Sequence, residues 1–267
     1  MTPMGRGDED RFDRQLEALG IRVRDADAFK VRDDVFDEVT LLALYRLIHK
    51  KRLSAIGGPI STGKEANVYR GEAGDRAVAV KIYRIQTANF NAMSVYLQGD
   101  RRFASVRRTR KEVIFTWTRK EFANLKRAHD AGLPVPEPLS FDRNILLMGF
   151  LGEDERPYPR LKEAEMVDPA ATYARVVEFV RRLYREARLV HADLSEFNIL
   201  LGDEVYVIDM GQSVTPDHPQ ALRFLMRDIR NVNRFFGERC PVRSEFEIFA
   251  ETTGIPLEEV LAGERER

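Results

Sequence analysis

The sequence lacks most of the features that would assign it to a specialised compartment. Its single cysteine, Cys240, excludes an intrachain disulfide framework and fits a reducing environment. No apolar run approaches the ~18–20 residues of a membrane-spanning helix, and the first residues, MTPMGRGDEDRF, are too polar for a signal peptide. Lys plus Arg and Asp plus Glu both number 43, so net charge selects no class of partner. We therefore expect a soluble cytoplasmic protein that does not enter a membrane.

What the chain does contain is a globular composition with a marked order of elements. It has 267 residues, of which 43% are hydrophobic and 32% are charged. Strand patterns and one helix come first, and mostly helical patterns follow. This order predicts an α+β fold of two lobes with a cleft at the strand Asn144–Gly152. We expect a helical extension over residues 1–52, an N-terminal lobe over 53–149 and a C-terminal lobe over 150–267.

The individual elements follow from periodicity and capping residues. Helices are expected over Asp33–Lys51, Thr109–Gly132, Asp168–Ala187, His218–Arg239 and part of 240–267. Strands are expected over Ala66–Gly71, Ala77–Arg84, Asn144–Gly152 and within Leu189–Leu201 and Glu204–Val214. The first two of these strands read as a hairpin. The segment Ile85–Ser105 shows no clean period, so we expect it to be irregular and mobile.

The stretch GGPISTGKEANVYRG, Gly57–Gly71, contains a glycine loop at Gly58–Lys64 that has the spacing of a P-loop. A P-loop needs a hydroxyl residue after its lysine and a helix behind it, but here Glu65 follows and a strand pattern comes next. We therefore expect the loop to bend between two strands over a triphosphate. An ordinary glycine hairpin turn is the alternative. The residues expected to contact nucleotide are Ser61, Thr62, Gly63 and Lys64.

Lys81 and Glu121 form a candidate ion pair. Lys81 lies in an apolar alternating strand, and Glu121 lies on the helical stripe formed by Trp117, Leu125 and Ala128. A buried carboxylate without a partner is costly, so this stripe calls for a cation nearby. A strand lysine paired with a helix glutamate positions nucleotide phosphates in protein kinases. The alternative is that Glu121 turns to solvent.

A second constellation lies in the stretches HADLSEFN and VIDMGQ. Asp193 and Asn198 are five residues apart, and Asp209 follows eleven residues after Asn198. Kinases place an aspartate near the accepting hydroxyl, then an asparagine and a second aspartate on Mg²⁺. We expect Asn198 and Asp209 to bind the metal and Asp193 to act as the acid/base or orienting group. His191 is expected to orient this loop.

The strand NILLMGFLG adds a third candidate feature, because adenine is commonly held by main-chain groups of the segment that joins two lobes. Met148 and Phe150 are therefore candidates for adenine contacts through their main chains. Simple core packing is the alternative for both residues.

Together these residues resemble the RIO kinases, a family of atypical protein kinases, in the branch whose nucleotide loop reads STGKEANVY. The resemblance covers roughly Asp33–Gly237. Its motifs are STGKEANVY at Ser61–Tyr69, KIYR at Lys81–Arg84, WxxKEFxNLxR at Trp117–Arg127, HADLSEFN at His191–Asn198, IDMGQSV at Ile208–Val214 and HPxAxxFLxRD at His218–Asp228. One departure is Gly149, where the family often has an acidic residue.

The resemblance implies a trimmed bilobal kinase fold that uses ATP with Mg²⁺, or Mn²⁺ in its place. It implies serine/threonine autophosphorylation and ATP hydrolysis that passes through a phosphate on Asp209. It also implies a role in maturation of the small ribosomal subunit, with its precursor and rRNA as partners. A monomer is expected. The chain has little room after Asp209 and no APE motif, so we expect poor activity on free peptides.

The basic segment Arg101–Lys111, RRFASVRRTRK, has two interpretations. It can contact rRNA phosphates, or it can be a solvated loop and helix start. Ser105 and Thr109 are candidate autophosphorylation acceptors in the same stretch.

Two further functions remain as alternatives. A small-molecule phosphotransferase of the aminoglycoside or choline type has a similar H-x-D-x-x-x-x-N loop, but it needs a larger C-terminal substrate pocket. A pseudokinase that binds ribosomes without catalysis would not need the intact set of chemical residues. Those residues are Lys81, Glu121, Asp193, Asn198 and Asp209.

Overall fold

The computed structural model describes residues 22–23, 36–86, 90–103, 109–153 and 155–259. The chain forms two compact units. The first unit comprises Met1–Phe90, Arg107–Arg119 and Pro138–Phe150, and the second comprises Asn91–Val106, Lys120–Glu137 and Leu151–Arg267. Among the described residues, no helix combines the length and apolar character required to cross a lipid bilayer.

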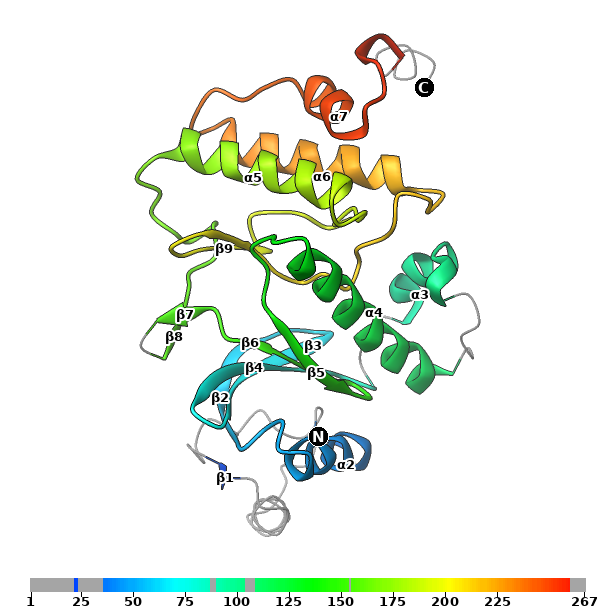
Figure 1. Cartoon of the computed structure of the whole chain (residues 1–267), viewed down its shortest axis with the longest axis vertical. Helices are drawn as coiled ribbons and strands as arrows, with labels where there is room; N and C mark the ends of the chain where they lie inside the picture. Colours follow the sequence, from blue (N-terminus) through cyan, green and yellow to red (C-terminus); the bar gives the residue numbers. More distant parts are fainter. Residues whose placement is uncertain (1–21, 24–35, 87–89, 104–108, 154, 260–267) are drawn as a thin grey trace, which may run out of the picture. The chain divides into compact units, whose positions relative to one another are not determined.

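The first unit contains a six-stranded sheet with the order β1-β2-β3-β4-β6-β5 (Figure 1). Its strands are β1 Arg22–Val23, β2 Ala55–Thr62, β3 Ala66–Ala73, β4 Arg76–Tyr83, β5 Pro138–Asp142 and β6 Ile145–Gly149. All neighbours pair antiparallel except β1 and β2. The predicted hairpin is confirmed, because β3 and β4 pair along their whole length. Gly74 takes the left-handed conformation (φ 65°) that the tight turn between them requires.

Helix α2, Glu38–His49, packs on this sheet and supplies much of its core. Asp37 caps the helix by accepting the Thr40 backbone N–H at 2.9 Å. The apolar side of α2 buries Leu44 and Leu47 against the strands. The buried Asn144 amide donates to the Thr40 hydroxyl at 2.8 Å, which links α2 to the turn before β6. The sequence predicted this helix; residues 33–35 of the predicted range lie outside the described residues.

The second unit is mostly helical, as predicted. Its main helices are α5 Pro169–Arg185, α6 Ala221–Phe236 and α7 Glu245–Thr253, and α5 and α6 lie side by side with α7 packed on both (Figure 1). Asp168 is the N-cap of α5, as expected from its position before Pro169. Two short antiparallel pairs complete the unit: β7 Gly152–Glu153 with β8 Arg156–Pro157, and β9 Ile199–Leu201 with β10 Val205–Val207.

Helix α4, Arg110–Asp130, has its first half in the first unit and its second half in the second unit. It matches the predicted helix closely. Gly132 follows it in the left-handed conformation (φ 67°), which suits a helix terminus.

The expectation that the whole segment Ile85–Ser105 is irregular is wrong for its described part. Residues Phe90–Gln98 form helix α3, and Arg101–Phe103 form a 3-10 turn, η2. Tertiary packing explains this: the Tyr96 ring lies 5.3 Å from the Phe224 ring, centroid to centroid. At Gly99, a Cβ atom would lie 2.1 Å from Nε2 of His218. The ring of His218 therefore occupies the space that any other residue would need there.

Candidate functional site

The loop His191–Asn198 is built around a buried histidine. The His191 Nε2 nitrogen lies 3.0 Å from the carbonyl oxygen of Ile208, and its Nδ1 accepts the backbone N–H of Asp193 at 3.3 Å. This pattern fits a neutral imidazole that carries its proton on Nε2. His191 thus joins the loop to the segment before Asp209, which is the orienting position expected from the sequence.

Asp228 of α6 holds the same loop from the other side. Its carboxylate accepts the backbone N–H groups of Ala192 at 2.7 Å and Leu194 at 3.0 Å, and Arg227 donates to the Ala192 carbonyl. Burial raises the pKa of Asp228 to about 7, although the two N–H donors act in the opposite direction. Ala192 takes a positive φ of 67°, a conformation that costs a non-glycine residue energy and needs such support. The sequence analysis included Asp228 in a family motif but assigned it no role.

Asp193, Asn198 and Gln212 form a connected group of side chains. The Asn198 amide donates to the Asp193 carbonyl at 2.9 Å and lies 3.4 Å from its carboxylate, to which Gln212 also donates at 3.0 Å. The Ile208 backbone N–H donates to the Asn198 carbonyl at 2.9 Å. Asp209 therefore lies on a short segment tied at one end to Asn198 and at the other to Asp193. Asp209 is exposed and its φ is 64°.

The donor set at this place fits a hard divalent cation. The amide nitrogen of Asn198 bonds to Asp193, so the amide oxygen is the atom of this side chain that could bind a metal, and Asp209 adds a carboxylate. Mg²⁺ is commonly held by one or two carboxylates together with substrate phosphates and water. Among the described residues, no group of three His, Cys, Asp or Glu forms an all-protein metal cage. Asn198 and Asp209 would supply two of the ligands that Mg²⁺ takes, so this pair suits a metal that arrives with a phosphorylated ligand.

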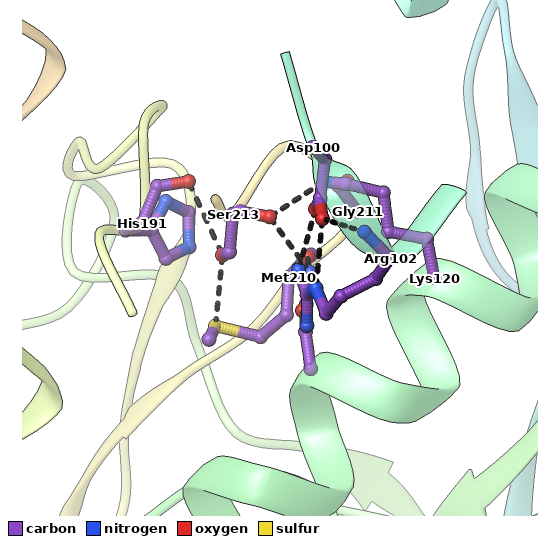
Figure 2. A network of polar contacts seen from close by, with 8 residues as sticks. Asp100, Arg102, Lys120, His191, Met210, Gly211 and Ser213 are labelled. Carbon is purple, nitrogen blue, oxygen red and sulfur yellow. Dashed lines mark hydrogen bonds and ion pairs between the residues drawn. The ribbon is translucent and has the colours of Figure 1, made fainter. Parts of the chain in front are cut away.

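Two buried side chains of α4 donate hydrogen bonds to the backbone that follows Asp209, and Figure 2 labels one of them, Lys120, beside Gly211 and Ser213. The Lys120 amine donates to the carbonyls of Gly211 at 2.8 Å and Ser213 at 2.5 Å. The Asn124 amide donates to the carbonyls of Met210 at 2.8 Å and Ser213 at 2.9 Å. Burial lowers the pKa of Lys120 to about 7. The sequence interpretation assigned neither residue a role.

The predicted apolar stripe of α4 is confirmed, since Trp117, Glu121, Leu125 and Ala128 are all buried. Glu121 is only 1% exposed, so the alternative in which it turns to solvent is wrong. Lys81 is also buried, at 6% exposure, in the C-terminal half of β4. Lys81 belongs to the first unit and Glu121 to the second, so their pairing stays a prediction.

The glycine-containing loop of the first unit connects β2 to β3, and no helix follows it. This excludes a P-loop, as the sequence predicted. The Gly63 backbone N–H donates to the Ala66 carbonyl at 3.0 Å and lies 3.4 Å from the Asn67 side-chain oxygen. Thr62, Gly63 and Lys64 are exposed and Ser61 is half-buried. A loop of exposed hydroxyl, glycine and lysine residues suits contact with phosphates.

Asn67 supports this loop; the sequence analysis included it in the STGKEANVY motif but assigned it no role. It is fully buried, its amide nitrogen donates to the Tyr69 hydroxyl at 3.1 Å, and Arg84 donates to its oxygen at 3.2 Å. The Arg84 backbone N–H also donates to the Glu65 carbonyl at 2.8 Å. The loop is therefore anchored to Arg84, the residue directly after β4.

Met148 and Phe150 differ in their settings. Met148 lies within β6, where it pairs with Ala79 of β4 and Pro138 of β5. Phe150 follows the strand, is half-buried, and has the Arg70 guanidinium 5.8 Å from its ring centroid. Their adenine contacts stay a prediction.

The basic segment Arg101–Lys111 is only partly described. Arg102 is partly exposed, and its guanidinium forms a 2.6 Å ion pair with the buried Asp100. Arg101 is exposed, 3.9 Å from Asp217. Ser105 lies outside the described residues, and the Thr109 hydroxyl lies 3.4 Å from the Glu112 backbone N–H.

Comparison with known proteins identifies relatives over most of the chain. A family model described as RIO domain matches residues 67–248. The RIO-type serine/threonine-protein kinase Rio1 of Haloferax volcanii is 49% identical over 85% of this chain and 78% of its own length. The serine/threonine-protein kinases RIO1 of Caenorhabditis elegans and Homo sapiens are 43% and 41% identical over 85% and 84% of this chain. The chain spans only 46% and 40% of those two proteins.

The fold has a solved counterpart. The crystal structure of the Rio2 kinase–ADP/Mg²⁺–phosphoaspartate complex from Chaetomium thermophilum superposes with a TM-score of 0.63 at 21% identity, over 100% of this chain and 87% of that one. A second structure of that Rio2 kinase gives a TM-score of 0.61 at 22% identity, over 85% of this chain and 78% of that one. The likeness confirms the predicted kinase-like α+β fold.

Proposed function

Because this chain belongs to the RIO family of atypical serine/threonine protein kinases, we propose that it binds ATP with Mg²⁺ and transfers the γ-phosphoryl group to serine or threonine, including residues of its own chain. The observation that carries this is the group formed by Asp193, Asn198 and Gln212 around the segment of Asp209. A carboxylate, an amide oxygen and a second carboxylate in this order are the groups that phosphoryl transfer requires.

The site residues of the second unit fall into three roles in this proposal: proton acceptance, metal binding and support of the loop. Asp193 accepts the proton of the attacking hydroxyl or orients that hydroxyl, and its carboxylate is fixed by Gln212. Asn198 and Asp209 hold the metal, which would neutralise charge on the phosphates when bound. The neutral His191 and the buried Asp228 keep the loop in place without touching the substrate.

Residues of the first unit supply the nucleotide contacts in the same proposal. Lys81 contacts the phosphates with Glu121 as its partner, and Met148 and Phe150 offer main-chain groups to adenine. Mn²⁺ would serve in place of Mg²⁺. The residues of the exposed β2–β3 loop that we expect at the phosphates are Ser61, Thr62, Gly63 and Lys64.

The proposal includes ATP hydrolysis through a phosphate on Asp209. The exposure and positive φ of Asp209 support this, since it lies outside the buried backbone that follows it. The solved Rio2 kinase complex with ADP and Mg²⁺ contains a phosphoaspartate. Residues 210–220 connect Asp209 directly to α6 and are tied to the interior, so little is left to grip a peptide. A switch driven by ATP therefore fits better than a kinase for free peptides.

The cellular part of the proposal rests on the family resemblance. It is a role in maturation of the small ribosomal subunit, in the cytoplasm, with the subunit precursor and its rRNA as partners and the kinase as a monomer. The exposed residues Arg101, Arg110 and Lys111 are the described basic residues of this segment that remain candidate RNA contacts. Steep salt dependence of RNA binding that flattens in Arg101→Ala would support the contact by Arg101.

Radiolabelled ATP with Mg²⁺ tests the enzymatic part. Wild-type protein is expected to acquire label in two forms: acid-stable phosphate on serine or threonine, and hydroxylamine-labile phosphate on Asp209. Asp193→Asn is expected to lose the acid-stable form, and Asp209→Asn to lose both. Absence of any label or hydrolysis in the wild type would indicate a pseudokinase. Transfer to an aminoglycoside or choline, but not to protein, would indicate a small-molecule phosphotransferase.

A further inference from the structure

The backbone after Asp209 depends on hydrogen bonds from side chains that are distant in sequence. Lys120 and Asn124 together donate four bonds of 2.5–2.9 Å to the carbonyls of Met210, Gly211 and Ser213. Both side chains are fully buried. Residues 210–213 also contribute a backbone bond of their own, from the Ser213 N–H to the Met210 carbonyl. The path of the segment is therefore set largely by α4.

A further pair of residues fixes the orientation of Asn124. Its side-chain oxygen accepts from Arg102 Nη1 at 2.9 Å, so the amide nitrogen must face the carbonyls. Arg102 is itself held by Asp100, through Nε at 2.9 Å and Nη2 at 2.6 Å. Asp100, Arg102 and Lys120 gather beside Met210, Gly211 and Ser213 (Figure 2). A continuous chain of bonds thus runs from η2 to the segment after Asp209.

The cost of this arrangement suggests that it does more than stabilise the fold. Burying an amine and a carboxylate is expensive, and well-packed apolar side chains are often at least as stabilising. The fall in the pKa of Lys120 reports that cost, with burial as its main cause. Lys120 and Asn124 instead fix the directions of the carbonyl groups of Met210, Gly211 and Ser213. These carbonyls lie directly after Asp209 and on both sides of Gln212, which bonds to Asp193.

Building on the proposed function, we propose that Lys120 and Asn124, braced by Arg102 and Asp100, are positioning residues that aim Asp209 and Gln212 for phosphoryl transfer. The four side chains contact neither substrate nor metal. They act through the backbone of residues 210–213, on which the direction of the Asp209 carboxylate and the reach of Gln212 depend. A displacement of only about 1 Å at a reacting group can lower a rate about 100-fold.

The first test compares Asn124→Leu with Asn233→Leu. Asn233 is a matched control, because it is a nearly buried asparagine of α6 that donates to the Arg243 carbonyl at 2.8 Å and accepts from Tyr173, away from Asp209. We expect Asn124→Leu to lower kcat of autophosphorylation about 10- to 100-fold and to raise the Mg²⁺ concentration needed for half-maximal rate. The control is expected to keep both values, with a similar loss of stability in urea.

A direct binding measurement removes the dependence on turnover. Calorimetric titration of Mg²⁺ into the protein with a non-hydrolysable ATP analogue is expected to show weaker metal binding, by about tenfold, in Asn124→Leu and not in Asn233→Leu. Equal losses of activity and metal affinity in the two variants would show a purely structural role and overturn the inference. An inactive wild type would instead contradict the proposed function.

The second test uses the brace, and it remains available if Asn124→Leu fails to fold. Arg102 is partly exposed and reaches the segment through Asn124. Arg102→Leu is expected to lower kcat about 3- to 10-fold. The double variant with both substitutions is expected to lower kcat no more than Asn124→Leu does alone. If Asn124→Leu does not fold, Arg102→Leu must still bind Mg²⁺ more weakly than the wild type does. Losses in kcat that multiply in the double variant, or unchanged Mg²⁺ binding in Arg102→Leu, would contradict the proposal.

Discussion

The β2–β3 loop and the segment around Asp209 are both proposed to act on one nucleotide, yet they are built in opposite ways. The loop is exposed and closes on its own neighbours, through the bond from Gly63 to Ala66 and the support of Asn67. The segment around Asp209 is held from α4 and α6 by side chains that are distant in sequence. A loop held by bonds between near neighbours can adjust when one of its residues is replaced. A segment held by side chains from other helices is displaced when one of those side chains is replaced. Substitution of the residues that support the segment around Asp209 should therefore have the larger effects on activity and stability.

The largest expected effect is chemical and lies in the second region. Asp193→Asn keeps an oxygen that can accept from Gln212 but removes the negative charge. We expect autophosphorylation to fall about 10³-fold or more, with stability changed by less than about 0.5 kcal/mol. Initial rates and urea unfolding measured on the same sample check this. A fall of less than tenfold would remove Asp193 from its proposed role.

The next effect is on stability. Asp228→Ala leaves the N–H groups of Ala192 and Leu194 without their buried acceptor. We expect a loss of about 2–4 kcal/mol in the free energy of unfolding. Fluorescence of the single tryptophan, Trp117, reports the urea transition. As a control, Asp203→Ala at the exposed Tyr206 contact should change stability by less than about 0.5 kcal/mol. Comparable losses in the two variants would contradict the proposed dependence on Asp228.

Lys120 should produce a pH dependence of intermediate size. Its pKa is about 7 in the folded chain and 10.5 ordinarily, so the unfolded chain binds more protons between these values. Stability should therefore rise with pH across this window and fall as pH drops towards 7. Between pH 7 and 9 we expect wild type to gain about 2 kcal/mol relative to Lys120→Met. Urea midpoints at several pH values measure the difference. Parallel pH profiles would show that Lys120 remains charged in the folded protein.

The smallest effect on stability should come from the β2–β3 loop. Lys64→Met removes an exposed charge and should change the free energy of unfolding by less than about 0.5 kcal/mol. If Lys64 contacts the phosphates, KM for ATP should rise several-fold while kcat changes little. Glu65→Gln, one residue further on, is the control for a nonspecific change of charge. An unchanged KM in Lys64→Met would remove the lysine from the nucleotide site.

The same contrast separates what the sequence reveals from what it hides. The hairpin, the cap of α5 and the spacing of Asp193, Asn198 and Asp209 are local patterns, and each could be recognised in one stretch of sequence. The contacts of Lys120 with Gly211 and Ser213 join positions more than 90 residues apart. A lysine that bonds to backbone carbonyls requires no particular partner side chain. Its target therefore leaves no signature in the sequence.

Two missed features did leave a partial signal. Lys120 and Asn124 are four residues apart on a helix, so they share a face, and that face adjoins the apolar stripe containing Trp117. Asp228 stands among Phe224, Leu225 and Ile229 in α6, where a lone acid predicts a buried partner. Helix α3 had no such signal, because its position depends on the rings of Phe224 and His218.

The close approach of His218 to Gly99 means that any side chain at residue 99 would push the imidazole and α3 apart. A single methyl group there cannot fit beside the imidazole, so Gly99→Ala must shift α3 or rotate the ring. Asp100 is the next residue and begins the chain of bonds that ends beside Asp209. One added carbon atom, placed where no nucleotide or metal is proposed to bind, would thus alter the proposed phosphoryl-transfer site.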